Sequence, residues 1–333
     1  MTPDTVVIMG PALSPPVMAA AETRGIRTVT MRPYERPDIA RDLVEAEQPT
    51  AIIVRMGRLT RDIMAASGKL LVIVKHGVGV DTIDVDAATK RGIPVLIAPG
   101  ANTRSVAEHA LALMLSLARG VPELDRRMRS GHWDKATTTG IELFGKTLGV
   151  VGLGAIGRTL LSLAVPLGMK AVAYDPFVVG AGTNFPGLAD LVLVPSLEAL
   201  LREADIVSLH CPLTAGNRGM IGEAQFACMK PDALLINTAR GELVDPEALV
   251  RALSSGRIGG AGLDTFFPEP PAPDSPLWRF PNVVATPHIG AYTREAKERV
   301  GQIALGHVLD AIDGRPLNAE ATVNKETLKT PPA

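Results

Sequence analysis

The sequence is poor in the residues that mark several classes of protein. Its 333 residues include only two cysteines, Cys211 and Cys228, too few and too far apart for a disulfide framework or a zinc site. Charge is balanced, with 34 basic and 35 acidic side chains and a formal net charge of −1, which gives no basic surface for nucleic acid or an anionic membrane. We therefore expect no metal, nucleic-acid or membrane partner, and a reducing, cytoplasmic setting.

The sequence also lacks a hydrophobic run long enough to cross a bilayer. Its most apolar helical stretch, 110–118, follows Glu108 and His109 and falls short of the roughly 20 apolar residues that a spanning helix needs. The N-terminus has neither a basic region nor a long apolar core, so we expect no secretory signal. With 46% hydrophobic residues, the composition and length predict a compact protein of two domains.

Short β-branched runs alternate with helical patterns along the chain, a pattern typical of parallel α/β sheets. One series of runs occupies the N-terminal third, and a second begins at residue 147. The expected strands are 5–10, 27–30, 51–55, 70–74 and 94–98, then 147–154, 170–175, 204–211, 233–239, 259–264 and 282–287. We therefore predict an α/β fold of two doubly wound, Rossmann-like domains, each with its own parallel sheet, and a cleft between them.

Two long helical patterns predict where the chain passes between the domains. The first, 102–120, begins with a capping residue and ends in Arg119-Gly120, as helix ends prefer. The second, 294–312, follows the last expected strand and can return the chain to the first domain. We expect a discontinuous outer domain of 1–101 plus 290–333 that encloses a contiguous domain of 102–289.

A glycine motif follows the first strand of the second series. Gly152, Gly154 and Gly157 have the G-x-G-x-x-G spacing, directly after an apolar strand and at the start of a helical pattern. In this context the glycines permit a tight turn, close approach of a pyrophosphate and close helix–strand packing. A glycine-rich turn without a ligand remains the alternative.

The next expected strand ends at Asp175, where a carboxylate can accept hydrogen bonds from the ribose hydroxyls of a dinucleotide. The same carboxylate repels a 2′-phosphate, and the stretch 175–182 contains no Arg or Lys to attract one. Strand, helix and acid together predict a dinucleotide site that prefers NAD to NADP.

Later strands of the second series are followed by polar residues at their carboxyl ends, where open α/β sheets bind ligands. The segment 210–212 (HCP) follows one strand, Arg240 the next, Asp264 and then Glu269 another, and His288 the last. Each also has a simpler explanation: a surface charge for the arginine, a cap or solvated acid for the carboxylates, and a loop position for the histidine. Together they predict a site at the nicotinamide end of the cofactor.

These residue types suit hydride transfer to a 2-keto acid. The planar guanidinium of Arg240 can bind the substrate carboxylate and polarise the carbonyl. The imidazole of His288 can give a proton to the developing alkoxide. Glu269 lies between Pro268 and Pro270 in a segment that cannot be helix or central strand, and we expect the prolines to direct it at His288, fixing the imidazole's tautomer and favouring its protonated form.

Taken together, the motifs resemble those of the D-isomer-specific 2-hydroxyacid dehydrogenases, the family of D-3-phosphoglycerate dehydrogenase and glyoxylate/hydroxypyruvate reductase. The similarity extends over nearly the whole chain. It is carried by HGVGVDTIDVDAATKRGIPV (76–95), NTRSVAEHALAL (102–113), GKTLGVVGLGAIG (145–157), NTARGELVDPEAL (237–249), GAGLDTFFPEP (260–270) and TPHIGAYT (286–293).

The resemblance implies an NAD-dependent D-2-hydroxyacid dehydrogenase with Arg240, Glu269 and His288 as catalytic residues. It implies a flavodoxin-like substrate-binding outer domain, where Val78 and Gly79 bind the substrate carboxylate and Arg55 contacts the substrate. Residues implied at the NAD site are Thr103, Gly152, Gly154, Ala155, Ile156, Gly157, Asp175, His210, Cys211, Pro212, Thr238, Ala239, Asp264 and Gly290. The family forms homodimers through the NAD-binding domain, so the segment around Trp133 is an expected interface.

Some residues depart from the family pattern, and other functions stay open. Met56 follows Arg55 where relatives often have serine, Lys75-His76 is an unusual polar pair, and Asn217 replaces a common threonine. The formate dehydrogenase branch differs by an amide at the position of Glu269. A dinucleotide-sensing, corepressor-like binding protein on the same fold is an alternative, as is D-3-phosphoglycerate dehydrogenase specifically. The substrate is not predicted from the sequence.

Overall fold

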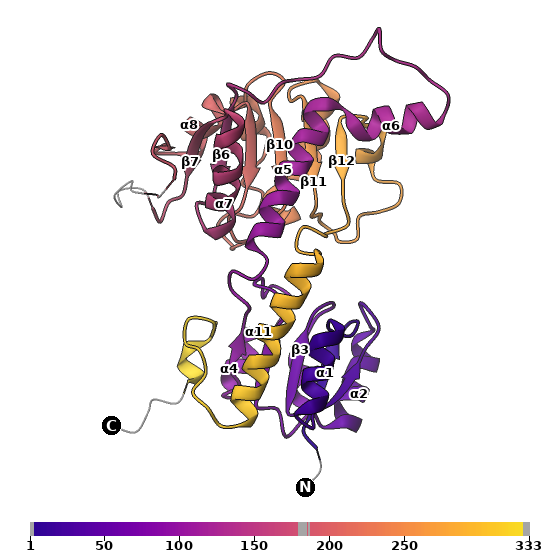
Figure 1. Ribbon diagram of the computed structural model, residues 1–333, viewed down its shortest axis with the longest axis vertical. Helices are drawn as coiled ribbons and strands as arrows, with labels where there is room; N and C mark the ends of the chain where they lie inside the picture. The colour runs from indigo at the N-terminus through magenta and orange to yellow at the C-terminus, as the bar shows by residue number, and fades with distance from the viewer. Residues whose placement is uncertain (1–2, 179–184, 186, 329–333) are drawn as a thin grey trace. The chain divides into compact units, whose positions relative to one another are not determined.

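The computed structural model describes residues 3–178, 185 and 187–328. The chain divides into two compact units (Figure 1). Unit 1 comprises Met1–Asn102 and Tyr292–Ala333, and unit 2 comprises Thr103–Ala291. Each unit contains one sheet in which all paired strands are parallel, so the predicted fold class of two doubly wound α/β domains is confirmed.

Unit 1 has a five-stranded sheet in the order β2-β1-β3-β4-β5. Its strands are β1 (Thr5–Met9), β2 (Arg27–Thr30), β3 (Ala51–Val54), β4 (Val72–Lys75) and β5 (Val95–Leu96). Its helices are α1 (Pro15–Thr23), α2 (Pro37–Glu47), α3 (Arg61–Ala65), α4 (Val85–Lys90) and α11 (Arg294–Ile312). The central strands β1 and β3 are buried along their whole length, as expected for parallel strands covered on both faces, whereas the edge strand β2 is partly exposed.

The C-terminal segment completes unit 1. Helix α11 begins after Thr293, whose hydroxyl accepts the N–H of Ala296 at 3.0 Å, and packs against β4 and α1. Further on, the buried Asn324 binds the backbone near β5: its Oδ1 accepts the N–H of Val95 at 2.7 Å and its Nδ2 donates to Ile93 at 3.0 Å. Residues distant in sequence therefore form one core with the N-terminal strands.

Unit 2 has a seven-stranded sheet in the order β12-β11-β10-β9-β6-β7-β8. Its strands are β6 (Thr147–Val151), β7 (Lys170–Tyr174), β8 (Val192–Leu193), β9 (Ile206–Leu209), β10 (Leu234–Asn237), β11 (Gly260–Leu263) and β12 (Val283–Ala285). Its helices are α5 (Thr103–Arg119), α6 (Val121–Arg129), α7 (Ala155–Ala164), α8 (Leu197–Glu203), α9 (Glu223–Cys228) and α10 (Pro246–Ser254). Helix α5 packs on α7, β10 and β11, across the sheet that Figure 1 shows behind it.

Strand ends differ from the sequence-based expectation. The expected strand 147–154 ends at Val151, because Gly152 turns the chain with a φ of 96°. The expected strand 204–211 is only Ile206–Leu209. Strand β8 was missed: it is only two residues long, and the apolar run 191–194 in which it lies is too short to distinguish a strand by its pattern. Within the described residues no helix is long and apolar enough to cross a membrane.

Candidate active site

The glycine motif forms the turn between β6 and α7. Gly152 has a φ of 96°, and a Cβ on it would come within 2.6 Å of the Cys211 nitrogen, so only glycine fits. A Cβ on Gly157 would overlap the carbonyl oxygen of Gly152. A Cβ on Gly154, by contrast, would have no atom within 4 Å, and this residue caps α7 without a side chain. The first turn of α7, which includes Ala155 and Ile156, therefore presents its N–H groups to an open surface that suits a pyrophosphate.

Asp175 follows β7 and lies beside this turn. Its Oδ2 accepts the N–H of Leu153 at 2.9 Å and its Oδ1 accepts the N–H of Phe177 at 2.9 Å. The carboxylate is thus oriented by the glycine turn itself, and each oxygen retains a lone pair for a ribose hydroxyl. Residues 179–182 of the stretch expected to lack a cation lie outside the described residues.

The HCP segment follows β9, next to the glycine turn. The His210 imidazole is 2.8 Å from the Ser208 hydroxyl, and burial lowers the pKa of His210 to about 4. Burial raises the pKa of the Cys211 thiol to about 11. Both side chains are therefore uncharged near neutral pH, and Pro212, which follows them, is exposed.

The loop after β10 carries Thr238, Ala239 and Arg240. The Thr238 hydroxyl is buried and makes no hydrogen bond within the described part of the chain, as expected for a group whose partner is a ligand. Asn237 shapes the loop: its Oδ1 accepts the N–H of Ala239 at 3.1 Å and its Nδ2 donates to the Arg240 carbonyl at 2.7 Å. This orphaned hydroxyl, the open Gly154 and the oriented Asp175 carboxylate together fit a bound NAD.

Glu269 and His288 come together in unit 2. The Nδ1 of His288 lies 2.7 Å from the Oε1 of Glu269, and both side chains are partly exposed, at 43% for the histidine and 32% for the glutamate. His288 has a φ of 54°, a left-handed conformation that is uncommon for residues other than glycine. Nearby, Gly241 approaches the backbone of Phe266 so closely that a Cβ could not fit, which packs the Arg240 loop against the loop leading to Glu269.

The left-handed conformation of His288 is supported by Asp264, which is 1% exposed. The Asp264 carboxylate accepts the N–H groups of Ile289 and Gly290, each at 2.8 Å, and the Thr286 hydroxyl at 2.6 Å. Burial raises the pKa of Asp264, but these hydrogen bonds and one from His109 outweigh it and hold the pKa below its ordinary value. The carboxylate therefore accepts most of its hydrogen bonds from the loop that carries His288.

Sequence reasoning missed His109. Its Nε2 is 2.9 Å from the Thr286 hydroxyl and 3.3 Å from the Asp264 carboxylate. The available signal was its spacing: His109 lies on α5 three residues after the buried Val106 and four before the buried Leu113, on the face that packs against the sheet. A polar residue within an apolar stripe indicates a buried partner.

The residues expected to contact the substrate are divided between the units. Arg55, Val78 and Gly79 belong to unit 1, whereas Arg240 and His288 belong to unit 2. In unit 1 the Arg55 guanidinium donates to the carbonyls of Pro11 and Ala12. Val78 is exposed and Gly79 half-buried in the loop after β4. Thr103, which is expected at the NAD site and not at the substrate, is the first residue of α5.

Comparison with known proteins adds independent information. Residues 111–290 match the model of the NAD-binding domain of the D-isomer-specific 2-hydroxyacid dehydrogenases. A D-3-phosphoglycerate dehydrogenase from Archaeoglobus fulgidus is 39% identical over 312 residues, which are 93% of this chain and 58% of that relative. The chain thus spans little more than half the length of this relative.

Solved structures agree with the fold over its full length. The TT0316 protein from Thermus thermophilus is 36% identical with a TM-score of 0.86, covering 96% of this chain and 99% of that one. A glyoxylate reductase from Paecilomyes thermophila is 30% identical with a TM-score of 0.82, covering 97% of this chain and 99% of that one. These similarities extend to both units.

Proposed function

This chain belongs to the D-isomer-specific 2-hydroxyacid dehydrogenase family, and on that premise we propose that it interconverts a small 2-keto acid and its D-2-hydroxy acid with NAD. The observation that carries the proposal is the 2.7 Å contact between the His288 imidazole and the Glu269 carboxylate, in the unit that contains the glycine turn.

His288 is the proposed proton donor in keto-acid reduction. With Nδ1 directed at Glu269, the Nε2 of the ring is the nitrogen that can give a proton to the carbonyl oxygen as it becomes an alkoxide. The Glu269 carboxylate holds the ring in place through its Nδ1. Asp264 acts indirectly, because it holds the backbone that follows His288.

Arg240 is the proposed substrate-binding cation. Its Nη1 donates to the Ala239 carbonyl at 2.7 Å, which orients a guanidinium that can bind the substrate carboxylate and polarise the reacting carbonyl. The backbone around Val78 and Gly79 in unit 1 is the proposed second contact for that carboxylate.

The NAD would be held by the glycine turn, Asp175 and the loops at 210–212 and 238–240, and when bound as NADH it supplies the hydride. Gly154 leaves room for the pyrophosphate at the N-terminus of α7. The Asp175 carboxylate accepts the ribose hydroxyls and repels a 2′-phosphate, which favours NAD over NADP.

The substrate is proposed as a class rather than a compound. The names of relatives favour 3-phosphoglycerate and glyoxylate as members of that class. The test is steady-state reduction of glyoxylate, hydroxypyruvate, pyruvate, 2-ketoglutarate and 3-phosphohydroxypyruvate with NADH and NADPH. Reduction of at least one, lost in His288→Ala, supports the proposal; NADH binding without reduction of any overturns it in favour of a sensing protein.

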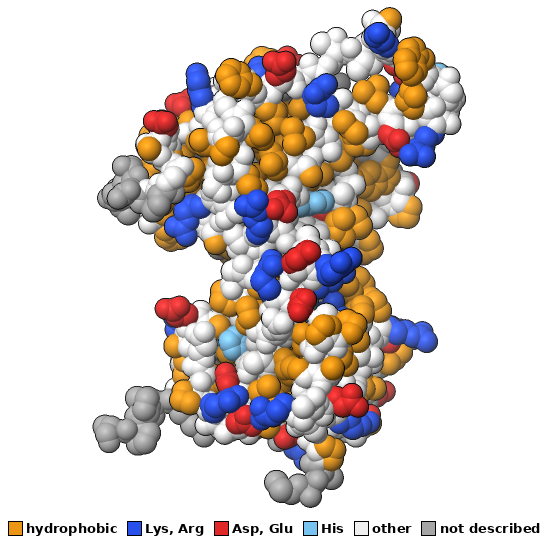
Figure 2. Space-filling model, viewed as in Figure 1, with side chains coloured by type: hydrophobic (Ala, Val, Ile, Leu, Met, Phe, Trp, Pro, Cys, Tyr) orange, Lys and Arg blue, Asp and Glu red, His pale blue; other side chains and the backbone are white. Residues whose placement is uncertain are grey.

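We also propose that the protein is a cytoplasmic homodimer that associates through unit 2. Large apolar side chains are exposed on and after α6: Val121 at 54%, Met128 at 52% and Trp133 at 75%. Figure 2 shows hydrophobic side chains on this face of unit 2, over α5 and α6. The two cysteines are free, which is consistent with a reducing compartment.

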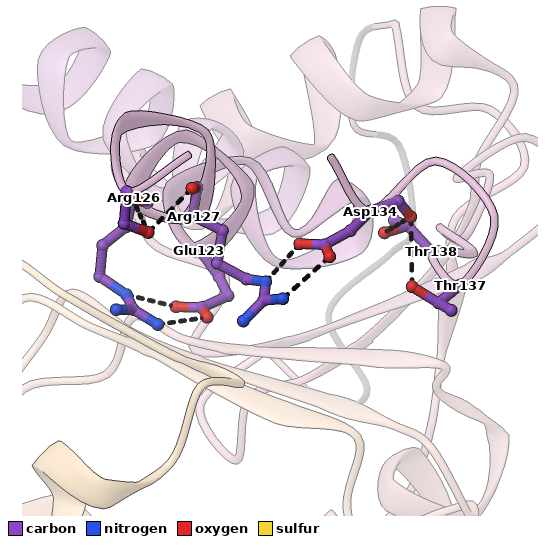
Figure 3. Close-up of polar contacts among 7 residues, drawn as sticks. Glu123, Arg126, Arg127, Asp134, Thr137 and Thr138 are labelled. Carbon is purple, nitrogen blue, oxygen red and sulfur yellow. Dashed lines mark hydrogen bonds and ion pairs between the residues drawn. The ribbon is translucent and has the colours of Figure 1, made fainter. Parts of the chain in front are cut away.

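The segment that carries Trp133 is held in shape by its own polar contacts (Figure 3). Arg126 pairs with Glu123 at 2.6 Å, and Arg127 binds Asp134 through both carboxylate oxygens. The Asp134 carbonyl also accepts the hydroxyl of Thr138 at 3.0 Å. A segment ordered in this way can present an exposed tryptophan to a second copy at little entropic cost.

A further inference from the structure

His109 contacts two loops of unit 2 that lead to the proton donor. It lies on α5, a helix that packs against β11 and β12. Asp264 directly follows β11 and Thr286 directly follows β12, at the carboxyl ends of these parallel strands. The Nε2 of His109 is 2.9 Å from the Thr286 hydroxyl and 3.3 Å from the Oδ1 of Asp264, so one nitrogen joins the helix to both loops.

The proton on this nitrogen is determined by its neighbours. The Thr286 hydroxyl donates its single proton to the Asp264 carboxylate at 2.6 Å. At the contact with His109 the hydroxyl oxygen can therefore only accept, and so can the ionised carboxylate. A neutral ring with its proton on Nδ1 would turn a lone pair toward these two acceptors. The Nε2 of His109 is thus a donor whether the ring is neutral or charged.

The contact with His109 also helps to keep the buried Asp264 ionised. Asp264 is 1% exposed, and a buried carboxylate is unfavourable unless donors or a cation stabilise its charge. Burial raises the pKa of Asp264, and the hydrogen bond from His109 comes first among the contacts that together hold it below its ordinary value. The helix therefore supplies part of the stabilisation on which the charge of Asp264 depends.

His109 packs on the loop that carries the proton donor. A Cβ on Gly290 would lie 3.5 Å from the Cδ2 of His109 and 3.0 Å from the Oδ2 of Asp264, so the ring and the carboxylate both border this glycine. Gly290 and Ile289 each donate their N–H group to Asp264 at 2.8 Å, and these two residues directly follow His288. A continuous series of contacts therefore runs from α5 through His109 and Asp264 to the backbone beside the proton donor.

We propose that His109 is a positioning residue for the proton donor His288. Its Nε2–H orients the Thr286 hydroxyl and stabilises the charge of Asp264, and that carboxylate holds the backbone that follows His288. In this role His109 acts through the loop and not on the reacting atoms. The inference rests on the proposed function and adds to it a residue on a helix that carries none of the proposed catalytic groups.

The first test measures kcat for reduction of the best keto-acid substrate with NADH, together with the Kd for NADH. In His109→Phe, which retains a ring but has no donor, kcat should fall about tenfold or more, as for loss of a hydrogen bond to a charged group, while the Kd for NADH is retained. His109→Gln places an amide N–H near the position of Nε2 and should restore most of kcat. The matched control is Glu108→Gln, at the exposed neighbouring position of α5, which should leave kcat unchanged. An unchanged kcat in His109→Phe overturns the inference.

A double-mutant cycle separates this role from simple packing. If His109 acts through the Asp264 carboxylate, its loss should matter little once that carboxylate has been replaced. His109→Phe should therefore lower kcat about tenfold in the unaltered protein but about twofold or less in the Asp264→Asn background. A role in packing alone would give the same fold-change in both backgrounds, and that result overturns the inference.

Failure of the proposed function has a different signature. If the unaltered protein reduces no keto acid, positioning is measured by NMR on the ring signals of its six histidines, among which His288 is identified by the loss of its signal in His288→Ala. A His288 signal that shifts in His109→Phe and returns toward its original position in His109→Gln supports the inference for a protein with another activity. A His288 signal that is the same in His109→Phe as in the unaltered protein, or a His109 ring with its proton on Nδ1, overturns it.

Discussion

The Asp264 carboxylate accepts the backbone N–H groups of Ile289 and Gly290, the two residues that follow His288, each at 2.8 Å. A buried acid on one loop thus determines the backbone path of the histidine on another. Asparagine in Asp264→Asn has nearly the same size as aspartate. It presents to these N–H groups either an amide NH₂, which is a donor, or an amide oxygen, which is a weaker acceptor than a carboxylate. We expect kcat for keto-acid reduction to fall about 10²-fold, the loss typical of a misplaced catalytic group, while NADH still binds.

The same carboxylate makes stability depend on pH. Because the native pKa of Asp264 is below its ordinary value, the native state gains stability from the ionised group above the unfolded-state pKa. That stability is lost as pH falls through the native pKa. The free energy of unfolding, measured with urea at neutral and at acid pH, should therefore change less with pH in Asp264→Asn than in the unaltered protein. An equal change in the two proteins would contradict this account.

Removing the charge of Glu269 should slow keto-acid reduction. Its carboxylate lies 2.7 Å from the Nδ1 of His288 and orients the ring that gives the proton. In Glu269→Gln, which has nearly the same shape, kcat for keto-acid reduction should fall about 10²- to 10⁴-fold while NADH affinity is retained. An unchanged kcat would show that Glu269 does not act on His288.

Asp175 should determine the choice of cofactor. Its oxygens lie beside the glycine turn, where they can accept ribose hydroxyls, and losing such hydrogen bonds to a charged group costs about 10- to 100-fold. We expect the unaltered protein to have the higher kcat/KM with NADH. In Asp175→Ala the kcat/KM for NADH should fall, while that for NADPH should stay the same or rise. Equal kcat/KM for the two cofactors before mutation would reject this role.

Alanine substitutions at two glycines of the motif should have different effects, one on stability and the other on NADH binding. In Gly157→Ala the new methyl group meets the Gly152 carbonyl and the Val150 side chain, so we expect a loss of about 1–3 kcal/mol in the free energy of unfolding. In Gly154→Ala the methyl group meets nothing within 4 Å, so Tm should hold. NADH binding, followed by fluorescence, should nevertheless weaken about tenfold in Gly154→Ala, because the methyl occupies the pyrophosphate's place. Unaltered affinity in this variant would argue against a cofactor at the turn.

Trp133 offers a test of the proposed dimer. Its side chain is 75% exposed, and a glutamate there places charge in an apolar interface. Light scattering should report a dimer for the unaltered protein and monomer for Trp133→Glu. Leu71→Glu, at an exposed apolar position of unit 1, is the control and should stay dimeric. If Trp133→Glu is still a dimer, the interface does not depend on Trp133.

Local patterns were sufficient to predict much of this protein. Buried parallel strands appear as apolar runs because both faces are covered, and the glycine spacing predicts its turn because Gly152 needs a positive φ and Gly157 a close contact. The helix predicted at about 294–312 has those bounds in the structure, where Thr293 caps it locally. The proximity of Glu269 and His288 was predicted because both residues follow strands at their carboxyl ends and because prolines flank Glu269.

Only long-range packing decided the rest. The spacing of His109 indicates a buried partner but does not identify it, and the residue meets Asp264 because α5 packs against β11 and β12. Asp264 supports the His288 loop because chain segments more than twenty residues apart converge there. The buried Thr238 hydroxyl likewise has no hydrogen-bond partner within the described part of the chain, and this is not visible in the sequence, because burial and partners depend on neighbours in space and not on neighbours in sequence.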